Sequence, residues 1–464
     1  MIRLSIYKRN EPQRLLFSHE SVENDWRQTV ERALGAGVSL AGANMEAFEL
    51  SGLQARGVDW TGVNLARANL HGADLSGACL VNAELGRADL DWAILDGANL
   101  TGAYLGAADL QHASLVRAIA HQADFQHSRL TGVNWDHANL SGANLGHTSL
   151  AGADLRAVNL RGANLVSTNL SRCVLDGANL ANAKLESASL CGARLDGTNL
   201  RNVMAEGADW SGAQVMQADL TGANLAHCQF VGALVARCTL RGAVLRGACA
   251  RWADLSESNF CFAILTHCDF SHADLSLTTF ATDDPGRSGV QTYAQGACFE
   301  HARLYEADLR YVDFTGANFN HARMVRCDLR YARLNQGLFT FATLNGSKLR
   351  EAQLREAVMQ RCALRRVDLS HADLSHAVLM EADLKGADLS GAQLFHTDLR
   401  KANLGGAELF FANFQHADLT EAYLGDTNSE GTDFCQAIFS NTQQTPGVSS
   451  LGISAQFPGR MDGR

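Results

Sequence analysis

An apolar residue recurs at every fifth position over most of the chain, and we call each of these residues a centre. One run of 49 centres extends from Leu40 to Phe280 without an exception, and a run of 29 extends from Phe299 to Phe439, in which Ser429 alone is polar. The residue two places before a centre is small, chiefly Ala, and the residue one place before is often Asp or Asn. The residue two places after a centre is often Gly.

A period of five fits neither an α-helix nor a flat strand. Five helical steps rotate a side chain by about 140°, and in a strand the centres would alternate between faces, so neither element buries all of them. A chain that bends every five residues does bury the small residue and the centre, and it favours Gly at the bend. Such coils stack about 4.8 Å apart, with equivalent positions forming ladders. The pattern therefore predicts a continuous β-solenoid.

The recurring units GADLS, GANLT, GADLR and EADLK resemble the pentapeptide-repeat family over roughly residues 38–439. The resemblance implies an all-β fold, a right-handed quadrilateral β-helix with four pentapeptides per coil. Two phenylalanine series agree with a coil of 20 residues, namely Phe260 and Phe280, and then Phe299, Phe319 and Phe339. About 20 coils would form a rod about 95 Å long.

Residues 1–36 lack the repeat. LSIYKRN and RLLFSH flank Glu11-Pro12 as a predicted hairpin, and apolar residues at helical spacing follow it: Val22, Trp26, Val30 and Leu34. An open coil end exposes core and unpaired backbone, so this small α+β segment is predicted to cap the solenoid.

The remaining chain divides into two repeat blocks, 37–280 and 299–440, a break at 281–298 and a polar tail at 441–464 that is predicted to be disordered. Phe280 and Phe299 are 19 residues apart. The break is therefore either an irregular coil short by one residue, or a protruding loop inserted between neighbouring sides. The phenylalanine series and Val290 favour the first geometry, with Phe299 above Phe280.

Composition supports one repetitive object. Only 4 of the 464 residues are proline, and all lie outside the two blocks, as expected where each ladder needs its backbone donors. The apolar share of 46% excludes wholesale disorder. No apolar run approaches the roughly 18 residues of a membrane span, and MIRLSIYKRN lacks the apolar core of a signal peptide. We therefore expect a cytoplasmic protein without a membrane partner.

The 12 cysteines and 16 histidines raise the question of metal binding. Six cysteines occupy the small inward position and are predicted to be free core residues: Cys173, Cys228, Cys238, Cys268, Cys327 and Cys362. No CxxC occurs, so neither a zinc site nor another cofactor is expected. Thirteen histidines sit two residues after a centre, where the bend explains them. Three of these are spaced by 20 and form a predicted column that could share a metal or sense pH: His376, His396 and His416.

The net charge of −10 is unevenly distributed. Residues 323–368 carry ten Lys or Arg against four carboxylates, a net of +6, and Arg310, Arg330 and Arg350 form a column. This basic band either binds anions or is neutralised by aspartates on the same side. Residues 71–110 carry six carboxylates against Arg87, a net of −5.

The sequence contains no G-x-S-x-G, GxxxxGK[ST] or HExxH pattern, and a regular ladder offers no deep cleft, so no enzyme is expected. The resemblance implies a protein-binding rod, since some family members mimic duplex DNA and bind type II topoisomerases. The partner would be DNA gyrase or topoisomerase IV, with no direct binding of nucleic acid. A duplex of about 95 Å carries about 56 phosphate charges, so a chain of net −10 can mimic only part of one.

Two groups of residues are predicted to contact the partner. The first is the acidic sector of the first block: Asp74, Glu84, Asp89, Asp91, Asp96 and Asp109. The second lies in the break, as in family members whose loops contact the topoisomerase: Asp283, Asp284, Arg287 and Tyr293. The alternatives are a structural spacer that docks partners through its ends, or a host-directed effector. The oligomeric state stays open.

Overall fold

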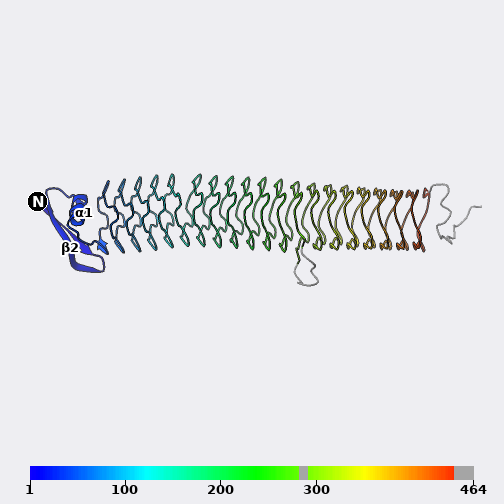
Figure 1. The fold of residues 1–464 in the computed structure, drawn as a ribbon, viewed down its shortest axis with the longest axis horizontal. Coiled ribbons are helices and arrows are strands. Elements are labelled where there is room, and N and C mark those ends of the chain that lie inside the picture. The colour runs from blue at the N-terminus through cyan, green and yellow to red at the C-terminus, as the bar shows by residue number, and fades with distance from the viewer. Residues whose placement is uncertain (282–290, 444–464) are drawn as a thin grey trace, which may run out of the picture. The chain divides into compact units, whose positions relative to one another are not determined.

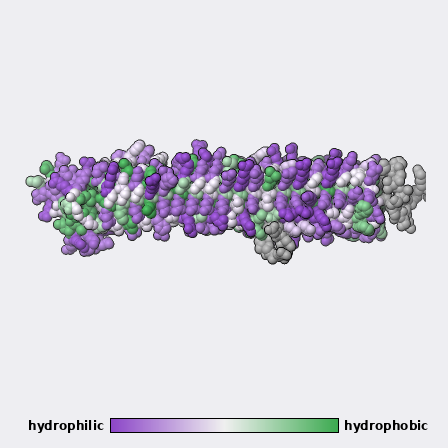
Figure 2. Space-filling model, in the orientation of Figure 1, coloured by the Kyte–Doolittle hydropathy of each residue, from purple (hydrophilic) through white to green (hydrophobic). Residues whose placement is uncertain are grey.

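The computed structural model describes residues 1–281 and 291–443. They belong to two compact units, Met1–Cys249 and Ala250–Arg464. Apart from a small N-terminal segment, the described part of each unit is a stack of coils (Figure 1). Hydrophilic side chains cover most of the face shown in Figure 2. Among the described residues, no helix has the length and hydropathy needed to cross a membrane.

Parallel bridges hold the coils together through the residue that precedes each centre. They join residues 20 apart, for example Asn44 to Asn64 and Asn64 to Glu84, so that four bridges complete one coil. The centres and the small residues beside them point inward, and Leu65 and Ala68 are both 0% exposed. The prediction of an all-β solenoid with a 20-residue, four-sided coil is confirmed.

The bends lie two residues after the centres and adopt positive φ. Gly62 has φ 67°, and many bends carry a side chain in the same left-handed conformation, such as His112 at 57°. Thirteen histidines occupy bends with φ between 55° and 61°. Local geometry therefore accounts for their position, although not for what their rings contact.

A hairpin and a helix precede the coils. Strand β1 (Ile2–Lys8) pairs antiparallel with β2 (Glu11–Ser21), and β1 also pairs with the short strand β3 (Ala43–Asn44) at the start of the first coil. The hairpin turn lies at Arg9 and Asn10, so Glu11 and Pro12 begin β2 and do not form the turn. The hairpin thus extends the ladder of the first coil.

Helix α1 (Trp26–Gly35) begins after Asp25, whose side chain accepts a hydrogen bond from the N–H of Gln28 at 2.8 Å. Val22 lies before the helix and is 83% exposed, so it is not part of the predicted apolar face. The ring of Trp26 stacks on Phe48 at 3.8 Å between centroids. The helix therefore packs directly against the first coil.

The ladder of bridges continues past the break, but the residues bridged across the break are further apart in sequence. Ile264 bridges Tyr293 across the break, a wider separation in sequence than in the regular ladder. Consequently Phe299 stacks on Phe270, with 5.1 Å between centroids, and the N–H of Phe280 donates to the carbonyl of Asp308 at 2.8 Å. The prediction that Phe299 lies above Phe280 was wrong. The observed bridges agree instead with the alternative geometry, in which extra residues are inserted between neighbouring sides of the coil.

The error has a physical cause. Every side of the coil offers an equivalent apolar centre, so a spacing close to one full coil between two phenylalanines does not identify the side that each occupies. The coil resumes at Tyr293 and Ala294, earlier than the predicted second block. Val290, which the sequence pattern assigns to the old register, lies outside the described residues.

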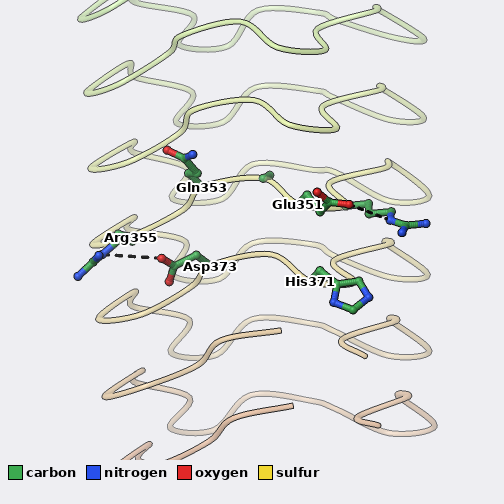
Figure 3. Close-up of a pocket in the computed structure, with 7 residues that line it drawn as sticks. Glu351, Gln353, Arg355, His371 and Asp373 are labelled. Carbon is green, nitrogen blue, oxygen red and sulfur yellow. Dashed lines mark ion pairs between the residues drawn. The ribbon is translucent and has the colours of Figure 1, made fainter. Parts of the chain in front are cut away.

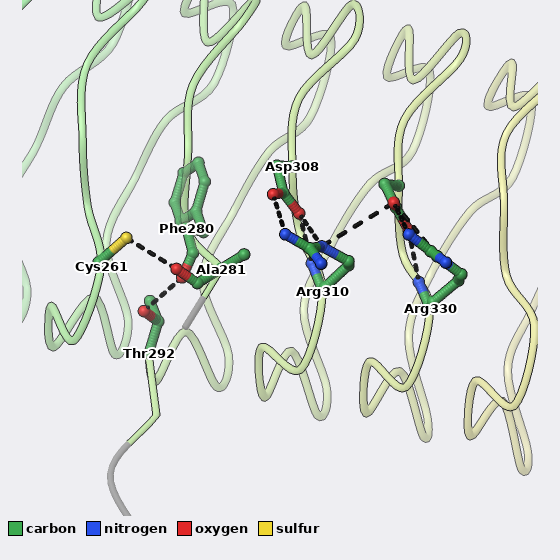
Figure 4. Close-up of polar contacts among 8 residues, drawn as sticks. Cys261, Phe280, Ala281, Thr292, Asp308, Arg310 and Arg330 are labelled. Carbon is green, nitrogen blue, oxygen red and sulfur yellow. Dashed lines mark hydrogen bonds and ion pairs between the residues drawn. The ribbon is translucent and has the colours of Figure 1, made fainter. Parts of the chain in front are cut away.

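Thr292 ties together the chain on both sides of the break (Figure 4). Its hydroxyl is buried and donates to the carbonyl of Phe280 at 2.7 Å, and it accepts the N–H of Phe262 at 2.9 Å. Nearby, the thiol of Cys261 donates to the carbonyl of Ala281 at 2.7 Å. At the other end of the unit, Gln443 still bridges Tyr423, so the coil continues beyond residue 440, and 444–464 lie outside the described residues.

Candidate functional site

The six carboxylates of the predicted acidic sector lie on three sides of the coils, because residues 20 apart stack and residues five apart occupy neighbouring sides. Asp89 and Asp109 bridge each other in one ladder, and Asp91 begins the bend that follows Asp89. The other three lie on the preceding and the following side: Glu84, Asp74 and Asp96. The structure therefore brings only half of the sector together.

Glu49 belongs to the same ladder as Asp89 and was missed in the sequence. It bridges Asn69, which in turn bridges Asp89, and its carboxylate accepts a hydrogen bond from the Asn69 amide at 2.9 Å. The sequence signal that could have revealed Glu49 is its spacing from Asp89, which equals two full coils. We call Glu49, Asp89, Asp91 and Asp109 the acidic edge.

Asp74 is not available to a partner, because it is 2% exposed. Arg56 covers it with an ion pair of 2.6 Å, and the Ser76 hydroxyl donates to it at 2.6 Å. Burial acts to raise the pKa of Asp74, but the hydrogen bonds from Ser76 and Arg56 outweigh it and hold the pKa below its usual value. The role of Asp74 is therefore structural.

Glu84, Asp96 and Asp109 also have partners within the unit. Arg9 pairs with Glu84 at 3.2 Å, and Arg129 pairs with Asp109 at 2.6 Å. One oxygen of Asp96 accepts hydrogen bonds from the Ser114 hydroxyl and from the Val116 N–H. The net charge of 71–110 thus overstates the field of this surface, since arginines outside the segment neutralise part of it.

Asp89 is the most available carboxylate of the sector, and Asp91 lies beside it. Asp89 is exposed and accepts the N–H of Asp91 at 3.0 Å, and within the described residues no basic side chain pairs with it. His71 and His112 lie 3.8 and 3.2 Å from Asp91. Beside them Trp92 is 59% exposed and stacks on His112 at 4.7 Å. The acidic edge therefore combines an exposed carboxylate that has no basic partner in the described residues, Asp89, with an exposed aromatic ring.

The four residues predicted in the break have different outcomes. Asp283, Asp284 and Arg287 lie outside the described residues. Tyr293 is half-buried and is the first ladder residue after the break, bridging Ile264 on one side and Asp313 on the other. Tyr293 thus belongs to a regular coil.

The basic band of the second unit is largely balanced by carboxylates. Arg310 pairs with Asp308 at 2.7 Å and lies 3.9 Å from Asp328, which pairs with Arg330 at 2.7 Å (Figure 4). Burial acts to raise the pKa of Asp328, but the hydrogen bonds from Arg330 and the charge of Arg310 hold it below its usual value. This arrangement favours neutralisation over anion binding for this column.

A hollow of about 810 Å³ lies in the same band (Figure 3). Its charged groups are paired, Arg350 with Glu351 at 3.4 Å and Arg355 with Asp373 at 3.9 Å. His371 lines it as well. The charges within each pair cancel, and the hollow is open to solvent.

The predicted histidine column exists. His376 and His396 stack at 5.4 Å between ring centroids, His396 and His416 stack at 4.5 Å, and Phe395 meets all three rings edge-on. Loss of hydration and the charges of its two neighbours lower the pKa of His396. No group of three or more His, Cys, Asp or Glu residues within 1–281 and 291–443 is arranged to hold a metal ion.

All twelve cysteines are free thiols, and the six at small inward positions are buried, as predicted. Burial raises the pKa of Cys173 to about 11 and that of Cys228 and Cys238 to about 12. Such thiols remain protonated and unreactive at neutral pH. They fill the core and offer no nucleophile.

Comparisons with known proteins agree with this architecture. The family described as "Pentapeptide repeats (8 copies)" matches the chain in overlapping segments over residues 49–280 and 291–443. No curated protein sequence matches the chain.

Among solved structures, HetL, a pentapeptide repeat protein from the cyanobacterium Nostoc sp. PCC 7120, is 27% identical, with 62% of this chain and 90% of HetL covered and a TM-score of 0.16. QnrB1, a plasmid-mediated fluoroquinolone resistance protein, is 16% identical, with 48% and 91% covered and a TM-score of 0.24. Neither TM-score supports an argument about function. The family match, together with the 20-residue ladders, shows that the chain belongs to the pentapeptide-repeat family.

Proposed function

We propose that this chain is a non-catalytic, protein-binding β-helix of the cytoplasm whose acidic edge contacts the DNA-binding surface of a type II topoisomerase, DNA gyrase or topoisomerase IV. The observation that carries the proposal is the exposed Asp89 and the half-buried Asp91 on one edge, beside the exposed ring of Trp92. Family members that mimic duplex DNA bind such enzymes, which is why a topoisomerase is the partner to test first.

The charge of the edge suits a short stretch of one DNA strand. Glu49 and Asp109 are three coils apart in their ladder, about 14 Å at the usual strand spacing. One strand of duplex DNA carries about four phosphates over that distance, and the complete duplex about eight. The edge holds four carboxylates, of which Arg129 neutralises Asp109. Mimicry would therefore be local, and an aromatic contact from Trp92 would supplement it.

The test measures binding of purified gyrase to the full chain and inhibition of supercoiling at low salt. The variant carries Asp89→Asn and Asp91→Asn, which removes two charges, while an Asn oxygen at position 89 can still accept the N–H of residue 91. The control carries Asp136→Asn and Asp154→Asn, which removes two charges from the neighbouring edge of the same unit.

We expect the acidic-edge variant to bind at least about tenfold more weakly, and the control to bind within about twofold of the original chain. Equal weakening of both variants would mean that only net charge matters and would refute a defined edge. Failure of gyrase and topoisomerase IV to bind the original chain at low salt would refute the proposal and favour a spacer that docks through its ends.

A further inference from the structure

A second surface, in the unit Ala250–Arg464, carries an uninterrupted column of exposed rings at successive bends. Trp252 stacks on His272 at 3.9 Å between centroids, His272 on His301 at 4.8 Å, and His301 on His321 at 4.7 Å. Phe341 follows His321 at 5.1 Å. A hollow of about 420 Å³ lies beside the three histidines.

The rings stack face to face on one another, with interplanar angles between 6° and 16°. At spacings of 3.9 to 5.1 Å no further ring fits between them, so the column offers no stacking platform for a nucleic-acid base. What the imidazoles present to solvent are ring edges, which carry N–H donors. A ligand rich in acceptor oxygens therefore suits this surface better than an aromatic one.

Two arginines complete the hollow. Arg303 and Arg323 bridge each other in the ladder that follows the histidine column, and both are exposed and line the hollow. Asp274 lies 3.9 Å from Arg303, whereas no acidic side chain in the described residues pairs with Arg323. Guanidinium groups on successive coils offer forked donors that match phosphate oxygens.

Charged and titratable side chains surround this hollow. The nearby permanent charges are Arg303 and Arg323 against Asp274 and Glu300, and Glu300 lies 3.9 Å from His301. These four sum to zero, Asp254 adds one carboxylate on the coil before Asp274, and Arg361, which lies over Phe341, is paired with Glu381 at 2.8 Å. Imidazole is the side chain whose charge ordinarily changes near neutral pH, and three imidazoles line this hollow.

The histidine column His376, His396 and His416 of the same unit is a natural contrast. Its rings stack in the same way, but the following ladder position carries Asp398 and Asp418 where the first column has arginines. Arg400 pairs with Asp398 at 2.7 Å and lies 3.9 Å from Asp418, so this column is followed by a paired ladder and not by two arginines that face a hollow. The arginine ladder is thus what distinguishes the first column.

We propose that the hollow formed by His272, His301, His321, Arg303 and Arg323 binds an oligophosphate, a ligand with two or more linked phosphate groups, and binds it more tightly as the pH falls. Linked phosphates fit because the donors repeat on three successive coils over about 10 Å, which one phosphate would not span. This site is independent of the acidic edge.

The experiment titrates the full chain with inorganic tripolyphosphate by calorimetry near pH 5.5 and near pH 8 at constant ionic strength. We expect binding about tenfold tighter at the lower pH. Phosphate itself loses negative charge on acidification, so a trend set by the ligand would run in the opposite direction. Orthophosphate and sulfate at matched ionic strength should bind at least about tenfold more weakly, since each reaches fewer donors.

Two variants assign the site. Arg303→Gln with Arg323→Gln should lose about tenfold or more in affinity near pH 5.5. His301→Asn with His321→Asn should remove most of the gain in affinity at low pH, because only His272 is left at the hollow, and Asn tolerates the positive φ of these bends. Circular dichroism checks that each variant is folded, and the histidine variant still tests the site if the arginine variant is not.

The matched control is His376→Asn with His396→Asn, which removes two stacked histidines from the aspartate-flanked column and should leave binding unchanged. The proposal is overturned if tripolyphosphate binds equally at both pH values, if sulfate competes equally, or if the control loses as much affinity as the site variants.

Discussion

Replacing Phe319 with alanine tests whether stacked aromatic centres hold neighbouring coils together. Phe319 is 0% exposed and lies between Phe299 and Phe339, with ring centroids 4.8 and 5.0 Å away. Phe314 meets it edge-on at 5.3 Å. Truncating a buried Phe costs about 3–5 kcal/mol, and each aromatic pair contributes about 0.5–1.5 kcal/mol of its own. Because three ring partners are lost, we expect a loss near the upper end of that range.

Phe319→Leu is the matched control, since leucine occupies most other centres. It fills most of the volume and loses the ring pairs, so we expect a loss of about 1–2 kcal/mol. Amide hydrogen exchange is the assay, because each coil contacts only its neighbours and protection should fall locally, around residues 299–339 and not around Leu419. A loss below about 1 kcal/mol for the alanine variant, or an equal loss of protection at Leu419, would refute this reasoning.

Three further outcomes are expected. Gly86→Ala would place a methyl group 2.6 Å from Cε1 of Tyr104, so the ring must move. We expect a changed near-UV circular dichroism signal and a free energy of unfolding lower by about 1 kcal/mol. An unchanged circular dichroism signal would contradict this expectation. Loss of hydration and two histidine neighbours lower the folded-state pKa of His396, so the unfolded chain binds the proton more tightly. The stability that the neutral His396 side chain contributes is present above about pH 6.5 and is lost as the pH falls through the lowered pKa. Between about pH 7.5 and 5.5, the melting temperature of the His396→Asn variant should therefore fall less than that of the original chain. Burial raises the pKa of Cys228 to about 12, so near pH 8 an alkylating reagent should label the exposed Cys435 at least about tenfold faster, and equal rates by mass spectrometry would show that the coil opens readily.

The repeat predicted the coil because its physical cause is local. A small residue, a ladder residue and a leucine recur every five positions, and burial of Leu65 and Ala68 requires only that the chain bend at that period. The register across the break was not predictable in this way. Phe299 is as well placed on Phe270 as it would be on Phe280, because the four sides present equivalent apolar centres.

The candidate sites show the same division between local and distant causes. The column His376, His396 and His416 followed from the 20-residue period alone. The neutralisation of Glu84 did not, because its partner Arg9 belongs to the N-terminal hairpin, 75 residues away. The column of Trp252 and the three histidines was hidden because its members straddle the break, where His272 and His301 do not follow the regular period and still stack.

Ile264 still bridges Tyr293 although more residues than usual separate them, so a bend can contain additional residues without changing how the coils stack. Lengthening a flexible connection is cheap, since each doubling costs only about 0.6 kcal/mol in closure entropy. Any outward bend is therefore a grafting point, where a foreign peptide can be inserted without shifting the register of the coils on either side. Proteins built in this way can acquire new binding loops by insertion, while their stacked coils keep the same sequence period.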